Sequence, residues 1–399
     1  MKRYRSACLV GLLLIATLTA CGSSGSSAKS STDKSPIVLG MVEDTSGPSA
    51  PYSTISAQGV KDAVKELNAN GGILGRPVQL VSADDGSSPT QSPTVVRQLV
   101  QEGAKELLLT SGSGAVIADK TVVQQSQVVA IAPTSIATQV VAPPDNTYVY
   151  TLANPTSDLG LVYSAAFKHD GISKVAVFTD NSSTTAANAK VLEAAFTASN
   201  INVVDVERVA SNANDVSAEV SRMKNSGAQA VMAIDEGGQL EILLWNAVSS
   251  VMPTTKKFSI PTIGDEPTVW SLASSGALNG LTYASSVTDT NPRTVALKAL
   301  FKKDNGPSSQ FSLYAAQAYG GVQLLAKAIT QAKTTSPAAV NLAMEKITKY
   351  QPAFGQAKAT LSFSPTKHAG ADALCGLSLV EFQNNKPGPL WSTYQPVCH

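Results

Sequence analysis

Histidine is scarce in this chain of 399 residues, and the three histidines that occur are scattered singly. His169, His368 and His399 lack the partner pattern of a catalytic base or of a metal site. The Gly-x-Ser-x-Gly motif of serine hydrolases is also missing, because the glycine-serine-glycine run at 112–114 does not have its spacing. We therefore expect a protein that is not an enzyme and that binds no metal and no cofactor.

The sequence also has no excess of one charge and no long apolar run. The sequence has 30 basic and 29 acidic residues, and it contains no basic stripe with interleaved aromatic residues. Such a chain gains little from phosphate contacts, so nucleic acid is not an expected partner. Beyond the first 20 residues, no apolar run approaches the roughly 18 residues that a transmembrane helix needs. Any link to a membrane must therefore come from the N-terminus.

The N-terminus has the composition of an export signal. Lys2, Arg3 and Arg5 precede an apolar run from residue 9 to residue 18, which is too short to span a bilayer. Residues 18–21 read LTAC, which is the lipobox pattern of bacterial lipoproteins. We expect residues 1–20 to be removed as a signal peptide and Cys21 to receive the lipid. The alternative is an ordinary secretory signal with an incidental cysteine.

A Ser- and Gly-rich segment, residues 21–35, follows the predicted cleavage site. This composition is typical of a flexible tether between a lipid and a folded domain. The predicted location is the outer face of the cell membrane, facing the periplasm if an outer membrane exists. Removal of the signal leaves 27 basic against 29 acidic residues, so the exported chain remains nearly neutral.

Two cysteines remain once Cys8 leaves with the signal and Cys21 takes the lipid. Cys375 and Cys398 both lie in the last 25 residues of a chain with an export signal. Exported proteins keep disulfides, so a bridge between these two cysteines is the economical prediction. A pair of free thiols is the alternative.

The stretch from residue 37 to residue 85 has the order of a βαβ unit. Residues 37–42 form a short apolar run suited to a buried parallel strand, which ends at the turn cluster Ser46-Gly47-Pro48. Apolar positions then repeat at helical spacing over residues 57–68, before glycines that end a helix. A second strand is expected at residues 78–81.

Strand and helix patterns continue to alternate along the chain. Strands at 107–110 and 128–133 enclose a helix at 115–125, and a second series over residues 175–234 repeats the pattern. The exported chain also exceeds the usual size of a single hydrophobic core. We therefore predict an α/β protein with two doubly wound, Rossmann-like lobes.

This order and spacing resemble the leucine/isoleucine/valine-binding proteins, the amino-acid class of the type I periplasmic binding proteins that feed ABC transporters. The resemblance implies three crossings between the lobes, which form a three-stranded hinge near residues 154–155, 283–287 and 354–355. The first lobe would comprise residues 36–153 and 286–354, and the second lobe residues 154–285 and 355–399. The binding site would lie between the lobes, and the partners would be ABC permease subunits. We expect a monomer.

Two loops of the first lobe follow predicted strands and open helices. Such places present unpaired backbone N–H groups that suit a carboxylate. Plain helix capping is the alternative, because Ser, Thr and Gly are the usual residues where helices begin. The candidate ligand-binding residues of these loops are Ser111, Gly112, Ser113, Thr134, Ser135 and Ile136.

The resemblance assigns roles to several of these residues and adds two more. Ser113 falls where the family uses a serine for the ligand's α-carboxylate, and Thr134 falls where a backbone carbonyl receives the ammonium. Ile136 departs from the pattern, since the family often has threonine there. Tyr52 matches the aromatic residue that covers the ligand from the first lobe, with simple loop packing as its alternative. Glu266 matches the acid that pairs with the ammonium from the second lobe, with a solvated loop charge as its alternative.

Two further positions depart from the branched-chain amino-acid binders. Thr184 and Glu236 stand where these relatives usually carry tyrosines that line the side-chain pocket. A more polar pocket would favour a polar amino acid, an amide or a related small carboxylate. We therefore predict a solute-binding receptor of an ABC importer that closes its lobes around such a ligand. A ligand-sensing lipoprotein that signals to a membrane partner is one alternative, and a lipoprotein hydrolase is a much weaker one.

Overall fold

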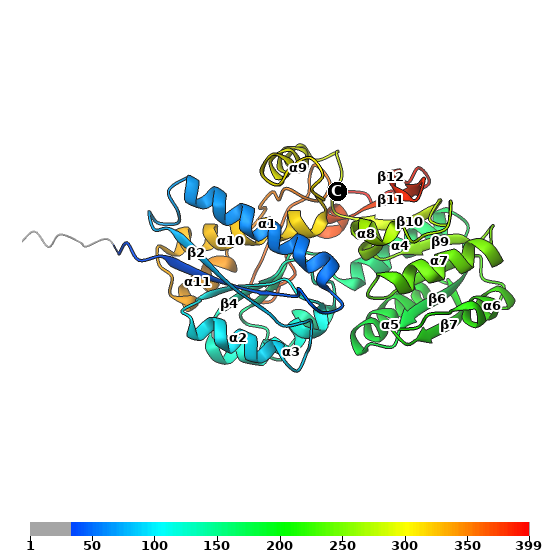
Figure 1. The fold of residues 1–399 in the computed structure, drawn as a ribbon, viewed down its shortest axis with the longest axis horizontal. Helices are drawn as coiled ribbons and strands as arrows, with labels where there is room; N and C mark the ends of the chain where they lie inside the picture. The colour runs from blue at the N-terminus through cyan, green and yellow to red at the C-terminus, as the bar shows by residue number, and fades with distance from the viewer. Residues whose placement is uncertain (1–32, 399) are drawn as a thin grey trace, which may run out of the picture. The chain divides into compact units, whose positions relative to one another are not determined.

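Two separate β-sheets organise the computed structural model, which describes residues 33–398 (Figure 1). The predicted signal peptide, Cys21 and nearly all of the predicted tether lie outside the described residues. No helix within residues 33–398 is long and apolar enough to cross a membrane. The described chain from Lys34 onward forms a single unit that contains both sheets.

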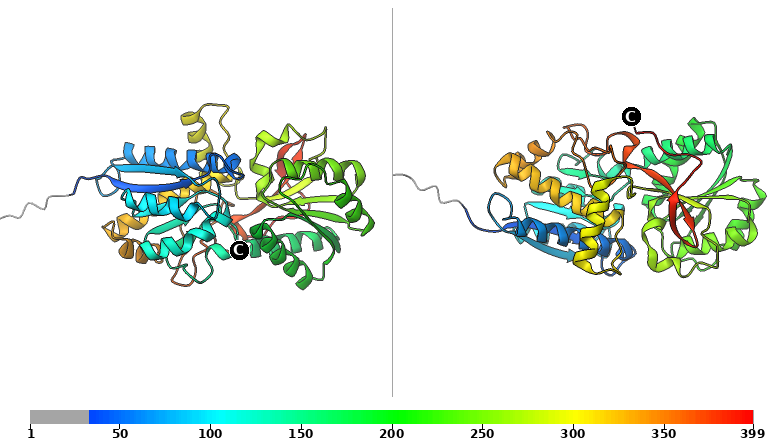
Figure 2. Two further views of the ribbon diagram at one scale, coloured as in Figure 1. Left: turned by 60° about the horizontal axis from the view of Figure 1, so that its bottom comes forward. Right: turned by 90° about the horizontal axis from the view of Figure 1, so that it is seen from above.

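The first sheet has five parallel strands in the order β2-β1-β3-β4-β5. Helices α1 and α10 pack together on one face of this sheet, and α2 and α3 cover the other face (Figures 1 and 2). The elements of this lobe are β1 (Ile37–Glu43), α1 (Ala50–Ala69), β2 (Val78–Asp84), α2 (Ser92–Gln101), β3 (Glu106–Leu109), α3 (Ser113–Ser126), β4 (Val129–Ala132), η1 (Thr138–Val140), β5 (Val149–Thr151), α9 (Pro292–Asn305), α10 (Leu313–Ala332) and α11 (Pro337–Met344).

The second sheet has seven strands in the order β12-β11-β10-β9-β8-β6-β7, of which only β11 and β12 run antiparallel to their neighbours. Buried apolar clusters lie on both faces of this sheet. The elements of this lobe are α4 (Thr156–His169), β6 (Lys174–Asp180), α5 (Ser183–Ala198), β7 (Asn202–Val209), α6 (Ser217–Asn225), β8 (Ala230–Ile234), α7 (Gln239–Val251), β9 (Lys256–Ser259), η2 (Pro261–Asp265), α8 (Pro267–Trp270), β10 (Leu281–Ser285), η3 (Ala373–Gly376), β11 (Ser378–Gln383) and β12 (Lys386–Leu390).

The predicted α/β fold with two parallel-sheet lobes is therefore confirmed. The apolar runs at 37–42 and 107–110 form buried strands because both faces of a parallel sheet are covered by helices.

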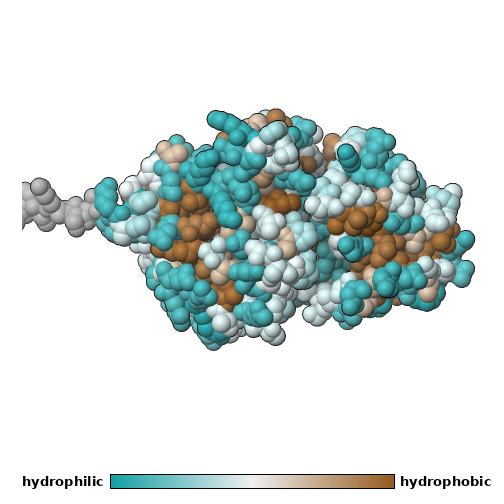
Figure 3. Space-filling model, in the orientation of Figure 1, coloured by the Kyte–Doolittle hydropathy of each residue, from teal (hydrophilic) through white to brown (hydrophobic). Residues whose placement is uncertain are grey.

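On the face drawn in Figure 3, the remaining apolar surface forms patches on each lobe that are bordered by polar residues. The apolar residues of the strands themselves lie inside the cores.

The first helix begins earlier than predicted. Helix α1 starts at Ala50, with Pro51 in its first turn, whereas the apolar spacing predicted a start at residue 57. Its first turns bury Ser53 and Ser56 beside Tyr52, and Ser53 Oγ accepts the N–H of Asp44 at 2.8 Å. Tyr52 consequently lies on a helix and not in a loop.

The predicted third crossing of the hinge needs correction. The chain crosses between β5 and α4 and again between β10 and α9, as expected. After Phe354, however, the chain returns to the first lobe, where Leu361 and Phe363 are buried in the core and Ala369 pairs with Thr151. The final crossing therefore lies between residues 371 and 378, because burial of these apolar side chains keeps residues 355–371 with the first sheet.

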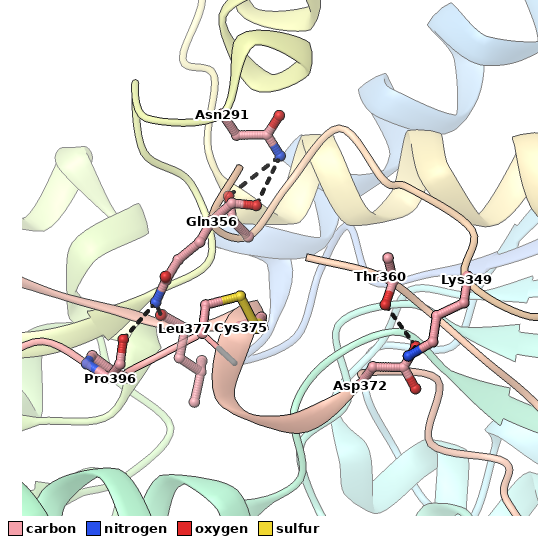
Figure 4. The surroundings of a disulfide bond; sticks show 10 residues. Asn291, Lys349, Gln356, Thr360, Asp372, Cys375, Leu377 and Pro396 are labelled. Carbon is pink, nitrogen blue, oxygen red and sulfur yellow. Dashed lines mark hydrogen bonds and ion pairs between the residues drawn. A yellow bond between two sulfur atoms is a disulfide. The ribbon is translucent and has the colours of Figure 1, made fainter. Parts of the chain in front are cut away.

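The predicted disulfide is confirmed at the last crossing. Cys375 and Cys398 are bonded, with their Cα atoms 4.7 Å apart. Figure 4 shows Gln356 beside this bridge, where its side-chain amide donates to the carbonyls of Leu377 at 2.8 Å and Pro396 at 3.0 Å. The disulfide and Gln356 together fix the C-terminus against the start of β11.

Candidate functional site

A cavity lies between the carboxyl ends of the parallel strands of the two sheets, and both lobes line it. The cavity has a volume of about 70 Å³. Most of the predicted ligand-binding residues meet here. Those that line the cavity are Tyr52, Ser111, Gly112, Ser113, Thr134, Ser135, Ile136, Thr184 and Glu236.

The start of α3 forms one part of the first-lobe wall. Gly112 precedes the helix, and a Cβ atom at this position would lie 2.8 Å from Ser49 Oγ, so a larger residue would displace the Ser49 side chain. The Gly112 N–H donates to Ser87 Oγ at 3.2 Å, and Ser111 Oγ donates to Asp85 Oδ1 at 2.7 Å. Ala115 and Val116 donate their N–H groups to the Gly112 carbonyl at 3.0 Å and 3.2 Å. Among the described residues, the N–H groups of Ser113 and Gly114 have no such acceptor, so they are available to an anion.

The loop after β4 forms the second part of this wall. Its backbone is held in place because Ser135 O accepts from Thr151 Oγ1 at 2.8 Å and Ile136 O accepts from the Thr156 N–H at 2.9 Å. The hydroxyl of Ser135 is buried, and it has no hydrogen-bond partner among residues 33–398. A buried hydroxyl without a partner is costly, so a ligand that bonds to it would recover this energy.

An aromatic pair covers the same side of the cavity. The rings of Tyr52 and Tyr314 stack with their centroids 4.7 Å apart, and the Tyr52 hydroxyl donates to Ser49 Oγ at 2.6 Å. Burial raises the pKa of Tyr52 well above its usual value, and the charge of Glu236 raises this pKa further. Tyr52 therefore stays neutral, and Glu236 of the second lobe lies within electrostatic reach of it.

The second-lobe wall is built around the carboxylate of Asp180 at the end of β6. Its oxygens accept the N–H of Ser182 at 2.7 Å, the hydroxyl of Thr185 at 2.6 Å and the N–H of Glu236 at 2.9 Å. Asp180 thus joins the loop that begins α5 to the loop that follows β8. Thr184 and Glu236, one from each of these loops, both line the cavity.

Two carboxyl groups of the loop after β8 face the cavity. Burial raises the pKa of Asp235 well above its usual value, and the neighbouring Glu241 and Asp180 raise it further. Burial, together with the charge of Asp180, raises the pKa of Glu236 to about 7. Among residues 33–398, no lysine, arginine or histidine lines the cavity.

Glu266 does not reach the cavity wall, so its predicted position needs correction. Its side chain is 1% exposed and accepts the N–H of Gly238 at 2.6 Å. Gly237 has φ +82°, and a Cβ atom there would lie 2.9 Å from the carboxylate oxygens of Glu266. The glycine loop therefore lies directly over Glu266, and burial raises the pKa of this carboxyl to about 8. Glu266 supports the loop that carries Glu236.

The sequence patterns did not predict several of the residues that line the cavity. Tyr314 and Gln317 come from the first turns of α10, and the Gln317 side-chain amide donates to Ser286 Oγ at 3.1 Å. No local motif marks these positions, because only the packing of α10 against α1 brings them to the cavity. Asp235 could have been found, since it stands next to Glu236 at the end of a strand. The remaining missed residues are Ala153, Asn154, Leu159, Thr185, Asn188, Ile260, Pro261, Thr262, Ser286, Leu313 and Leu377.

Comparison with known proteins decides the family. The model of the periplasmic binding protein family matches residues 36–376, which is most of the chain. The chain belongs to the periplasmic binding protein family. Among the similar proteins, Leu/Ile/Val-binding protein homolog 3 of Brucella melitensis is 26% identical over 341 residues, covering 83% of this chain and 88% of that protein. Leu/Ile/Val-binding protein BraC3 of Rhizobium johnstonii is also 26% identical, covering 76% of this chain and 81% of that protein.

Solved structures show the same fold for this periplasmic binding protein. The branched-chain amino acid transporter substrate binding protein LivJ of Streptococcus pneumoniae, in complex with isoleucine, matches with a TM-score of 0.76 at 21% identity. It covers 90% of this chain and all of its own. A solute binding protein of an ABC transporter from Rhodopseudomonas palustris, in complex with 4-hydroxybenzoate, matches with a TM-score of 0.76 at 18% identity over 91% of this chain and 97% of its own.

The family and the fold are those of solute-binding receptors and not of enzymes, so the hydrolase alternative is excluded. The family also acts outside the cytoplasm, in agreement with the predicted export of the chain. Within residues 33–398, no group of three or more His, Cys, Asp or Glu side chains is arranged to hold a metal ion.

Proposed function

We propose that this periplasmic binding protein is the solute receptor of an ABC importer and that it captures a small amino-acid-like ligand, or a related carboxylate or amide, between its lobes. The observation that carries the proposal is the division of one cavity between two chemically different walls. Hydroxyl groups and the start of a helix come from the first lobe, and carboxyl groups come from the second lobe. A ligand with a carboxylate at one end and a hydrogen-bond donor at the other suits both walls.

The first-lobe wall is the proposed carboxylate site. The N–H groups at the start of α3, the Ser113 side chain and the buried hydroxyl of Ser135 are neutral donors that face the cavity. Helix N-termini favour anions because their N–H groups are unpaired and the helix dipole is positive there. The backbone of Thr134 is the proposed acceptor for a donor group of the ligand, and Ile136 contributes only its backbone and apolar contact.

Close approach of the lobes supports capture by closure. A Cβ atom at Gly114 of α3 would lie 3.0 Å from Thr184 Oγ1 of α5, so the two helix starts nearly touch. The carboxylate of Asp265 in the second lobe also accepts the N–H of Leu313 in the first lobe at 3.1 Å. These contacts would form only when the lobes are together, which is how a hinged receptor retains its ligand.

The relatives support transport over sensing. Relatives named as Leu/Ile/Val-binding proteins cover most of this chain, and similar folds are described as transporter components. We therefore propose ABC permease subunits as the partners, a lipid on Cys21 as the anchor and a monomeric receptor. A ligand-sensing role with a membrane partner remains the second candidate, because it requires the same closure around a ligand.

A thermal-shift screen tests the proposal. The exported chain would carry Cys21→Ser, so that it is purified without lipid, and it would be screened against amino acids, their amides and aromatic carboxylates. A ligand at a hundred times its dissociation constant should add about 2.7 kcal/mol to the free energy of unfolding. A shift with at least one such compound, confirmed by calorimetry, supports the receptor function. The absence of any shift across the screen would contradict it.

A further inference from the structure

The cavity is acidic on one side, and no positive side chain of the described part of the chain lines it. Asp235 and Glu236 line it, and Asp180, Glu241 and Glu266 lie behind them within electrostatic reach. A carboxylate of a ligand can be held at the first lobe by neutral donors. A second negative group on the ligand would meet carboxyl groups at the second lobe and be repelled.

Most of these carboxyl groups have partners within the protein. Asp180 accepts three hydrogen bonds, and Glu266 accepts the N–H of Gly238. Asp235 Oδ1 accepts the N–H of Gly237 at 3.0 Å. Asp235 Oδ2 and Glu241 Oε2 are both buried without a donor, and each carboxyl group affects the pKa of the other. One proton shared between them satisfies both oxygens and leaves this pair with a single negative charge.

Glu236 is the exception. Its backbone N–H is bonded to Asp180, but no hydrogen bond or ion pair among residues 33–398 involves its carboxylate. The side chain is half-buried on the cavity wall, and its charge acts on Tyr52 across the cavity. Tyr52 in turn stacks on Tyr314. A carboxylate without a partner on the wall of a cavity is a suitable site for a cation, and the neutral Tyr52 within its electrostatic reach does not compete with that cation.

We propose that a cationic group of the ligand lies between Glu236 and Tyr52, and that this receptor selects small carboxylates with a net positive charge. The inference rests on the proposed function, because it concerns the same cavity. It narrows the ligand class to basic amino acids and their analogues. Amino acids with apolar or acidic side chains, and aromatic carboxylates without an amine, are poor ligands.

Ionisation of Glu236 links this selectivity to pH. The groups that face Glu236 are Asp180, Asp235, Glu266 and Tyr52, and none of them is positively charged. Burial raises the pKa of Glu236 to about 7, so the carboxyl group is largely protonated below that pH when no ligand is bound. A cationic ligand requires the ionised form. Its affinity therefore rises between pH 6 and pH 8, and its binding releases a proton.

A charge series of similar size provides the test. Calorimetry would compare ornithine, glutamine, norvaline and glutamate at pH 6 and pH 8, with 4-hydroxybenzoate as the carboxylate without an amine. We expect ornithine to bind at least about tenfold more tightly than norvaline at pH 8, as for a charged hydrogen bond. Tighter binding of norvaline, glutamate or 4-hydroxybenzoate would overturn the inference and leave the receptor function intact. Binding of none of these compounds, together with no hit in the wider screen, would overturn the receptor function as well.

Variants of Glu236 separate the charge from the shape of the site. Glu236→Gln should weaken ornithine binding at least about tenfold, remove most of its pH dependence and leave glutamine binding nearly unchanged. Glu236→Asp should retain the preference for ornithine because it retains the charge. Glu102→Gln is the matched control, since Glu102 is exposed on the first lobe and bonded only to Gln98. Ornithine selectivity that persists unchanged in Glu236→Gln would overturn the assignment of Glu236.

Discussion

The two walls of the cavity are built in different ways. The first-lobe wall consists of a helix start and small hydroxyl residues, so its binding groups are largely backbone atoms that no single side chain controls. The second-lobe wall presents side chains from several loops, but its acidic groups, Asp235 and Glu236, come from the single loop after β8. In the proposed complex, affinity for a carboxylate is therefore distributed over the first lobe, whereas selectivity depends on few residues of the second.

The second wall also depends on more supporting contacts. Asp180, Glu266 and two glycines with positive φ hold the loop of Glu236 in place. In the first lobe, the N–H groups at the start of α3 follow from the helix itself. Substitutions in the second lobe should therefore have larger effects than comparable substitutions in the first.

The largest effect on the free energy of unfolding is expected from loss of the disulfide. Replacement of Cys375 and Cys398 by serine should lower the free energy of unfolding by about 3 kcal/mol, because the bridge joins two residues that are 23 positions apart and so restricts the unfolded chain. Urea denaturation of this variant and of the unaltered protein, with and without reductant, measures the change. Identical midpoints for the two oxidised proteins would show that the bridge does not stabilise the second lobe.

The glycine loop over Glu266 should be the next most sensitive feature. Gly237→Ala places a Cβ atom 2.6 Å from Thr262 Cγ2 at a residue with φ +82°. We therefore expect the free energy of unfolding to fall by about 2 kcal/mol. Gly171→Ala is the matched control, since Gly171 has φ +70° but open space around it. The free energy of unfolding of this variant should fall by about 1 kcal/mol. Equal losses in thermal denaturation would mean that the contacts of the loop contribute nothing.

Closure depends on the contact between the two helix starts. Gly114→Val should hold α3 away from Thr184, since even a Cβ atom would lie 3.0 Å from Thr184 Oγ1. We expect ligand affinity to fall about tenfold, with an increased radius of gyration in small-angle scattering of the liganded protein. Gln125→Val at the exposed end of the same helix should change neither. Unchanged affinity in Gly114→Val would indicate that the lobes need not meet here.

The smallest effect is expected on the first-lobe wall. Ser113→Ala removes one hydroxyl but leaves the backbone N–H groups of α3, so ligand affinity should fall by about fivefold, near 1 kcal/mol. Calorimetry beside Glu236→Gln compares the two walls directly. A loss in Ser113→Ala that exceeds the loss in Glu236→Gln would reverse the comparison between the lobes.

Much of the fold could be predicted because apolar runs and turn clusters alternate regularly over residues 37–85 and 175–234. The start of α1 could not, because its first turns bury Ser53 and Ser56, and Ser53 Oγ accepts the N–H of Asp44 in a neighbouring loop. The return of residues 355–371 to the first lobe could not be predicted either. It depends on where Leu361 and Phe363 find an apolar surface, and no periodic pattern marks that choice.

The candidate site, too, could be predicted only in part from the sequence. Loops that come after strand ends lie at one edge of a parallel sheet, so residues 111–113 and 134–136 could be placed together from the sequence. The distinction between Glu236 and Glu266 could not, since it depends on a glycine loop that covers one carboxylate and presents the other. Tyr314 reaches the cavity only through the packing of α10 against α1.

A crystal structure of the exported chain carrying Cys21→Ser with bound ornithine tests the central claim most directly. We expect the ligand carboxylate within about 3.2 Å of the first N–H groups of α3, and a cationic nitrogen within about 4 Å of the Glu236 carboxylate. A ligand bound in the opposite orientation, or outside the cavity between the lobes, would contradict the account.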